Sequence, residues 1–331
     1  MPKAILLFST GLDSTLAFHI LRKLGIEVVV LVIKTPFTNP NEKVLEEIRQ
    51  QAKVIIYEAK EDYLELVKKP KFGYGKNMNP CIDCKIYMFK IAKKILEEEK
   101  ADFIASGEVL NQRKFSQTLG KLKLIEKEAG VEGLVVRPLS GKLLPETLPE
   151  KMGLIDRKKL LDIEGAERKK HMELVEEFGI NYFSQPAGGC LLTDPIFSIK
   201  LRDLKKHNPN FSLGDVELLK IGRHFRIGES KLILGRNEAE CKALEKIGKP
   251  VFLKYEGKGP SGIFVGDEKD LLIACEILAS YCKEDKVKVE VIKDGKKMMD
   301  IELEKKDKEN FRKFLITKSE SSLLSTEGLK R

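Results

Sequence analysis

Three of the six cysteines in this 331-residue sequence stand where thiols could do chemistry. Cys81 and Cys84 form a Cys-Xaa-Xaa-Cys pair that opens a predicted helix, and Cys190 follows two glycines much further along the chain. Thiols in such an arrangement can share a metal ion, share an iron–sulfur cluster or cycle as a disulfide. We expect the helix N-terminus to lower the pKa of the paired thiols, which would favour metal binding.

A polar stretch near the N-terminus could bind phosphate. Residues 9–15 read Ser-Thr-Gly-Leu-Asp-Ser-Thr and separate an apolar run at 4–8 from an amphipathic segment at 16–25. A strand, a turn and a helix N-terminus in this order make an anion site, because the first N–H groups of a helix lack intrahelical partners. The spacing excludes a Walker loop and a dinucleotide fingerprint. A plain turn with Ser and Asp as helix caps is the alternative.

This stretch resembles the Ser-Gly-Gly-Xaa-Asp-Ser loop of the PP-loop ATP pyrophosphatases, with Thr10 in place of the first glycine. Members of that family adenylate a substrate and release pyrophosphate, and the aspartate of the loop, here Asp13, helps to hold Mg²⁺ against it. The resemblance therefore implies ATP and Mg²⁺ as cofactors. The ATP-binding residues that it implies in this loop are Ser9, Thr10, Gly11, Leu12, Asp13, Ser14 and Thr15.

The elements that must position the loop alternate between strand and helix. Strands are predicted from apolar runs at residues 4–8, 27–33, 54–57, 101–107 and 134–139. This rhythm predicts an α/β fold with a doubly wound parallel sheet, in which ligands bind beyond the carboxyl ends of the strands. The resemblance implies that adenine is held after the second strand, so Ile33 and Phe37 are candidate neighbours of the base. Simple packing is the alternative for both.

A polar loop follows the fourth predicted strand and reads Gly-Glu-Val-Leu-Asn-Gln-Arg-Lys from residue 107. It resembles the Gly-Glu-Xaa-Xaa-Gly-Gln stretch of the thiolation enzymes within the PP-loop family, with Asn111 in place of the second glycine. The resemblance makes Gly107, Glu108 and Gln112 candidates for ATP binding. Arg113 and Lys114 are candidates for contact with RNA phosphates, which basic side chains bind well. A solvated loop is the alternative.

The cysteine segments, Asn-Pro-Cys-Xaa-Xaa-Cys-Lys and the later Gly-Cys, resemble those of tRNA 2-thiouridine synthases and related tRNA sulfur carriers. This resemblance covers about residues 1–200 and implies an ATP-dependent tRNA sulfurtransferase whose catalytic residues are Asp13, Cys81, Cys84 and Cys190. We favour a [4Fe-4S] cluster on the three cysteines, with one iron open to sulfide. A persulfide on Cys190, resolved by Cys81 or Cys84, also fits. A closed zinc site is disfavoured because it needs a fourth ligand.

The pattern changes near residue 199. Gly-Arg-His-Phe-Arg and Leu-Gly-Arg-Asn, further along, resemble a small α/β module found with RNA-quality-control proteins. We therefore expect a PP-loop domain with the cysteine site at 1–198, a second α/β domain at 199–318 and a disordered tail at 319–331. Candidate RNA-binding residues besides the two above are Arg157, Arg168, Arg223, Arg226 and Arg236, with solvated surface as the alternative. The other three cysteines, Cys241, Cys275 and Cys282, lie in segments with a helical pattern. Cys275 and Cys282 fall on an apolar face, so we expect them in the core.

Composition narrows the class of protein. A net charge of +9 with 34% charged residues suits a polyanionic partner such as RNA, although a thermophile-type surface has the same composition. The sequence has no 18-residue apolar run and does not open as a signal peptide, so we expect a cytoplasmic protein. The expected partners are tRNA and a sulfur donor, with a dimer possible. The alternatives are a PP-loop ligase or amidotransferase acting on a small molecule, and a non-catalytic RNA-binding protein.

Overall fold

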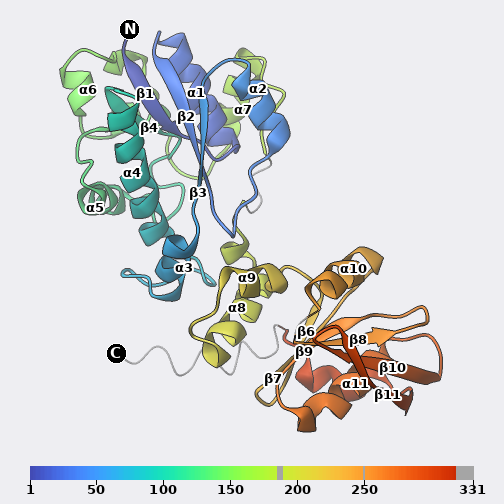
Figure 1. The fold of residues 1–331 in the computed structure, drawn as a ribbon. Coiled ribbons are helices and arrows are strands. Elements are labelled where there is room, and N and C mark those ends of the chain that lie inside the picture. The colour runs from blue at the N-terminus through green and yellow to red at the C-terminus, as the bar shows by residue number, and fades with distance from the viewer. Residues whose placement is uncertain (185–188, 249, 318–331) are drawn as a thin grey trace. The chain divides into compact units, whose positions relative to one another are not determined.

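The computed structural model describes residues 1–184, 189–248 and 250–317 and divides into two units, Met1–Asp194 and Pro195–Arg331 (Figure 1). The division lies a few residues before the position expected from sequence. The first four residues of the expected cysteine turn, 185–188, lie outside the described residues, and so does the tail expected at 319–331.

The first unit is built on a five-stranded sheet in the order β3-β2-β1-β4-β5, and all of its pairs are parallel. The strands are β1 (Lys3–Leu7), β2 (Glu27–Lys34), β3 (Val54–Glu58), β4 (Phe103–Ser106) and β5 (Val135–Val136). The predicted doubly wound parallel sheet is therefore confirmed. The strand order reverses between β1 and β4, and the carboxyl end of β1 is thus the position where ligands bind in such sheets.

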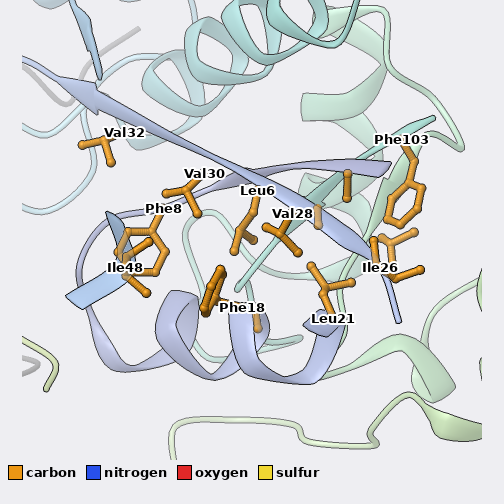
Figure 2. Packing of buried hydrophobic residues seen from close by; sticks show 14 of the residues in the cluster. Leu6, Phe8, Phe18, Leu21, Ile26, Val28, Val30, Val32, Ile48 and Phe103 are labelled. Atoms are coloured by element: carbon orange, nitrogen blue, oxygen red, sulfur yellow. The ribbon is translucent and has the colours of Figure 1, made fainter. Parts of the chain in front are cut away.

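Helices cover both faces of this sheet (Figure 1). They are α1 (Leu12–Lys23), α2 (Glu42–Arg49), α3 (Glu61–Lys68), α4 (Cys81–Glu98), α5 (Leu119–Ala129), α6 (Leu148–Lys151) and α7 (Lys169–Glu177). Side chains alternate along the strands, so Leu6 and Val30 meet Phe18 and Leu21 of α1 in a buried cluster (Figure 2). Helix α4 packs on β1 and β4 from the other face and against α5. This packing fixes where α1 and α4 begin, and both begin at the carboxyl edge of the sheet.

The second unit carries a six-stranded sheet in the order β11-β10-β8-β9-β7-β6, with every pair antiparallel. Its strands are β6 (Arg223–Ile227), β7 (Ser230–Leu234), β8 (Val251–Tyr255), β9 (Gly262–Val265), β10 (Lys286–Lys293) and β11 (Lys296–Glu304). Its helices are α8 (Pro195–His207), α9 (Leu213–Leu219), α10 (Glu238–Ile247) and α11 (Leu271–Ser280). Cys275 and Cys282 are buried in its core, as expected. Among the described helices, none is both long and apolar enough to cross a membrane.

Candidate functional site

The loop between β1 and α1 leaves the start of the helix without a side-chain cap. Gly11 is the N-cap residue, and no side chain there accepts from the first N–H groups. The hydroxyls of Ser14 and Thr15 instead donate to the carbonyl oxygen of Gly11, at 2.9 and 3.0 Å. The Oγ of Ser9 lies 3.3 Å from that of Ser14. The first turn of α1 can therefore still meet an anion through its backbone.

The two positions at which the sequence departs from the PP-loop patterns keep a backbone that glycine would adopt. Thr10 has φ +59° and Asn111 has φ +60°. Asn adopts this left-handed region fairly readily, whereas a β-branched residue does so rarely. The Oγ1 of Thr10 lies 3.2 Å from the Oγ of Ser184 and accepts from the backbone N of Asn41 at 3.2 Å. These contacts help to hold the left-handed conformation of Thr10.

Gly107 supports the same loop from the end of β4. A Cβ atom at this position would lie 2.6 Å from the carbonyl oxygen of Asp13 and 2.7 Å from the backbone N of Ser14. Real Cβ contacts are not that short, so a residue with a side chain would force the first turn of α1 away. Gly107 therefore lets the turn pack directly against the strand end.

Two side chains from the region of α7 lie against Asp13. The guanidinium of Arg168 donates to its Oδ1, and the Nε2 of His171 lies 3.2 Å from the same oxygen. Burial raises the pKa of Asp13, but the contacts with His171 and Arg168 outweigh it, so the pKa lies below its usual value. The structure thus places Arg168, expected at an RNA surface, beside residues 9–15, the candidate nucleotide loop. Sequence reasoning missed His171, which has no local signal beyond its spacing from Arg168.

Glu108 joins three elements beneath the cysteine helix. Its carboxylate lies 2.5 Å from the Nζ of Lys85 on α4 and accepts from the Nε of Arg137, after β5, at 3.0 Å. Burial raises the pKa of Glu108, but the charges of Lys85 and Arg137 lower it to about 2. In this structure the carboxylate is therefore engaged by protein cations. In the same loop, the Nε2 of Gln112 is buried and has no hydrogen-bond partner among the described residues.

The segments that carry the candidate thiols contact each other although they are far apart in sequence: the backbone N of Met78 donates to the carbonyl oxygen of Leu192 at 3.3 Å, and the Nδ2 of Asn77 donates to that of Thr193 at 2.8 Å. Cys81 and Cys84 open α4, and the hydroxyl of Tyr63 donates to the Sγ of Cys84 at 3.1 Å. Cys190 forms a β-bridge with Thr38, beyond the end of β2. Burial raises the pKa of Cys84 to about 12; Tyr63 opposes this change, and the charges of Cys190 and Cys81 add to it.

The expected lowering of the thiol pKa by the helix N-terminus is wrong. Burial raises the pKa of Cys81, although Lys85 and Arg113 act in the opposite direction. Burial likewise raises the pKa of Cys190 to about 11. Over the described ranges, no three His, Cys, Asp or Glu side chains are arranged to hold a metal ion. Three thiols are suitable ligands for an iron–sulfur cluster, but the sulfurs would have to close around it.

The remaining candidates in the first unit differ in exposure. Ile33 is buried, and Phe37 is 1% exposed, with its ring centroid 6.2 Å from that of Tyr63. The side chain of Phe37 therefore belongs to the core, while its carbonyl accepts from the N of Leu191 at 2.9 Å, beside the cysteine loop. Arg113 and Lys114 are both exposed.

Besides Arg168, four of the predicted RNA-binding arginines have intramolecular partners. Arg157 donates to Glu150 at 2.8 Å and to the carbonyl of Leu144 at 2.7 Å. In the second unit, Arg226 pairs with Asp203 through two bonds of 2.9 and 2.7 Å. The other two partners are Tyr281, whose ring centroid lies 5.0 Å from Arg223, and Glu240, which accepts from Arg236 at 3.0 Å. These contacts stabilise the units themselves.

The two units contain regions that match different known families. Residues 1–143 match the family model of the thiamine biosynthesis protein ThiI. Residues 222–315 match the family model of the NFACT protein RNA binding domain. The two predicted resemblances, to PP-loop thiolation enzymes and to an RNA-quality-control module, are therefore confirmed for these regions.

Curated relatives agree with the ThiI match. The chain is 31% identical over 169 residues to a probable tRNA sulfurtransferase of Methanobrevibacter smithii, covering 48% of this chain and 43% of that protein. A protein of the same name from Methanocaldococcus jannaschii is 31% identical over 144 residues, covering 42% and 37%. The chain thus spans less than half the length of these relatives.

Solved structures give weaker likenesses. A crystal structure of a 4-thiouridine synthetase–RNA complex with bound ATP aligns with a TM-score of 0.33 and 22% identity, covering 66% of this chain and 52% of that one. A predicted tRNA methyltransferase subunit from Methanocaldococcus jannaschii gives a TM-score of 0.32 at 17% identity, covering 56% and 94%. These values add nothing to the sequence matches.

Proposed function

We propose that this chain is an ATP-dependent tRNA sulfurtransferase, which adenylates an oxygen of a tRNA base and replaces it with sulfur delivered at the Cys81/Cys84/Cys190 site. The observation that carries the proposal is that the nucleotide loop and the cysteine segments are attached to one edge of one sheet. Thr10 bonds to Ser184 on the segment leading toward Cys190, and Cys190 pairs with Thr38 beyond β2. Helix α4, which carries the other two thiols, begins at the same edge.

The chemistry explains why ATP and sulfur would meet here. The carbonyl oxygen of uridine or cytidine is a poor leaving group, but it becomes a good one after attacking the α-phosphorus of ATP and displacing pyrophosphate. A nucleophilic sulfur then attacks the ring carbon, and the oxygen leaves with AMP. The uncapped first turn of α1 would stabilise the departing pyrophosphate. Asp13 carries the carboxylate that Mg²⁺ favours, and a bound Mg²⁺ would neutralise phosphate charge.

For the sulfur we favour a [4Fe-4S] cluster held by Cys81, Cys84 and Cys190, because three thiols leave one iron where sulfide can bind. A persulfide on Cys190, resolved by Cys81 or Cys84, uses the same residues. Anaerobic purification followed by iron and sulfide assays separates the two. A colourless, iron-free protein that still thiolates tRNA would eliminate the cluster.

The partners in this proposal are tRNA and a sulfur donor, which could be sulfide, a desulfurase or a carrier protein. The match of residues 222–315 to an RNA-binding family supports a docking role for the second unit. In the first unit, the exposed Arg113 and Lys114 lie in the loop after β4, at the edge where the base would arrive. We propose these two residues as RNA contacts.

The test is ATP–pyrophosphate exchange with and without tRNA, followed by mass analysis of the tRNA nucleosides. A sulfurtransferase gives tRNA-dependent exchange and a nucleoside 16 Da heavier, the difference between sulfur and oxygen at about 32 and 16 Da. A ligase for a small molecule would exchange without tRNA. A protein that only binds RNA would not exchange at all, and either of these results would overturn the proposal.

A further inference from the structure

Arg168 reaches the nucleotide loop from a distant part of the chain. It immediately precedes α7, and its guanidinium pairs with Asp13 in the first turn of α1. His171 lies one turn further along α7, with its Nε2 at 3.2 Å from the same carboxylate oxygen. The start of α7 therefore directs two basic side chains at a single carboxylate.

The two side chains differ in burial. His171 is fully buried, and neither ring nitrogen has a hydrogen-bond partner within the described residues. The side chains of Arg168 and Asp13 are 34% and 23% exposed. His171 thus backs the carboxylate from the protein interior, whereas Arg168 meets it where solvent, or a ligand, can reach the guanidinium.

The guanidinium has donors to spare. An arginine presents five N–H donors in a rigid fork that matches phosphate geometry. In the part of the chain that the structure describes, Arg168 uses one nitrogen, Nη1, for its hydrogen bond to Asp13. Because Asp13 lies in the first turn of α1, this bond holds the guanidinium near the uncapped start of that helix.

The negative charges of Asp13 and of a triphosphate explain why a cation would lie between them. Asp13 and Arg168 form an ion pair in the first turn of α1. A triphosphate entering the loop would be repelled by that carboxylate, and a cation beside it offsets the repulsion. A charged N–H donor aimed at phosphate also forms stronger hydrogen bonds than a neutral one.

We propose that Arg168 is a phosphate-binding residue of this nucleotide site and that Asp13 holds it in position. The inference rests on the proposed function, because the ligand is taken to be ATP. It assigns Arg168 to the nucleotide, not to the RNA surface expected from sequence. It also gives Asp13 a positioning role that does not depend on Mg²⁺.

The experiment measures equilibrium binding of ATP, and of adenosine, which lacks phosphates, to the full chain by titration calorimetry. Arg168→Ala should weaken ATP binding about 10–100-fold, which corresponds to the loss of a hydrogen bond to a charged group, and should leave adenosine binding unchanged. Arg168→Lys, which keeps the charge but loses the fork, should have an ATP affinity between those of wild type and Arg168→Ala. Lys170→Ala is the matched control, because Lys170 is exposed and pairs with Asp162 at 3.0 Å; it should bind ATP normally.

Two results would overturn the inference: an Arg168→Ala variant with unchanged ATP affinity, or one that loses adenosine affinity as much as ATP affinity. The second result would mean that Arg168 only maintains the loop. If Arg168→Ala fails to fold, the comparison of Arg168→Lys with Lys170→Ala decides. A wild-type chain that binds no ATP would overturn the proposed function itself, and this inference with it.

Discussion

The nucleotide loop and the cysteine site lie at the same edge of the sheet, but different kinds of contact hold them. The nucleotide loop is a continuous strand–turn–helix segment, and Gly107 closes it by direct backbone packing. The candidate cysteine site is assembled from α4, where Tyr63 bonds to Cys84, and from the segment around Cys190, which pairs with Thr38. The first therefore depends on local backbone geometry, and the second on long-range contacts between side chains and strands.

This difference has a chemical consequence. In the loop, basic neighbours lower the pKa of Asp13. Around the thiols, burial dominates and raises the pKa of Cys84 and Cys190 to about 12 and 11. Basic side chains therefore dominate the surroundings of Asp13, whereas burial dominates those of the thiols.

The largest expected effect is a loss of thiolation without a loss of ATP–pyrophosphate exchange. Cys190→Ser should reduce tRNA thiolation to background, because the sulfur-delivering site loses one of its three thiols. It should leave ATP–pyrophosphate exchange within about twofold of wild type, because the adenylation step does not use that thiol. Cys241→Ser, a half-buried cysteine in α10, is the control and should retain both activities. Thiolation by Cys190→Ser would show that sulfur is delivered elsewhere.

The second effect concerns the buried ion pairs of Glu108 with Lys85 and Arg137, which link the loop after β4 to the cysteine helix α4. Glu108→Gln removes the buried carboxylate charge between Lys85 and Arg137 and should cost about 3–5 kcal/mol of unfolding free energy. The pKa of Glu108 in the folded chain, about 2, lies below its usual value of 4.5. Its stabilisation is therefore full above about pH 4.5 and is lost as the pH falls through about 2.

Urea unfolding curves between pH 7 and pH 2 measure both the loss of unfolding free energy in Glu108→Gln and the acid dependence of wild type. Wild type should lose stability over the acid range, and Glu108→Gln should start lower and show a flatter profile. The exposed Glu58, which pairs with Lys34 at 3.5 Å, offers the control variant Glu58→Gln, expected to change stability by less than about 1 kcal/mol. Parallel pH profiles for wild type and Glu108→Gln would contradict the role given to the ion pairs of Glu108.

The sequence predicted the parallel sheet and the strand–turn–helix segment around residues 9–15, because both depend on patterns in consecutive residues. Apolar runs identify β1 and β2, and Ser-Thr-Gly-Leu-Asp-Ser identifies the turn. The pairings of Arg168 with Asp13, and of Glu108 with Lys85, join residues with no local signal for each other. The pKa of the thiols was misjudged for the same reason, since the burial that controls it comes from the folded unit.

The third prediction tests the close packing of the loop. Gly107→Ala would place a methyl group 2.6 Å from the carbonyl oxygen of Asp13, so the first turn of α1 must move. We expect a loss of about 1–3 kcal/mol of unfolding free energy and a larger relative loss in pyrophosphate exchange. Gly120→Ala is the matched control, because nothing lies within 4 Å of the added methyl in α5. It should be stabilised by about 0.5–1 kcal/mol; equal behaviour of the two variants would refute the packing argument.

The smallest effect asks whether Thr10 only reproduces the geometry of a glycine. Thr10→Gly removes the cost of the left-handed conformation, about 1–2 kcal/mol, and the hydroxyl bonds to Ser184 and Asn41, worth a similar amount. The stability measured by urea unfolding should therefore change by less than about 1 kcal/mol, and exchange should persist. Thr10→Val keeps the strained backbone and loses the hydroxyl, so it should be clearly less stable than Thr10→Gly. If both variants lose exchange alike, the hydroxyl contributes to nucleotide binding directly, and backbone geometry alone does not define this loop.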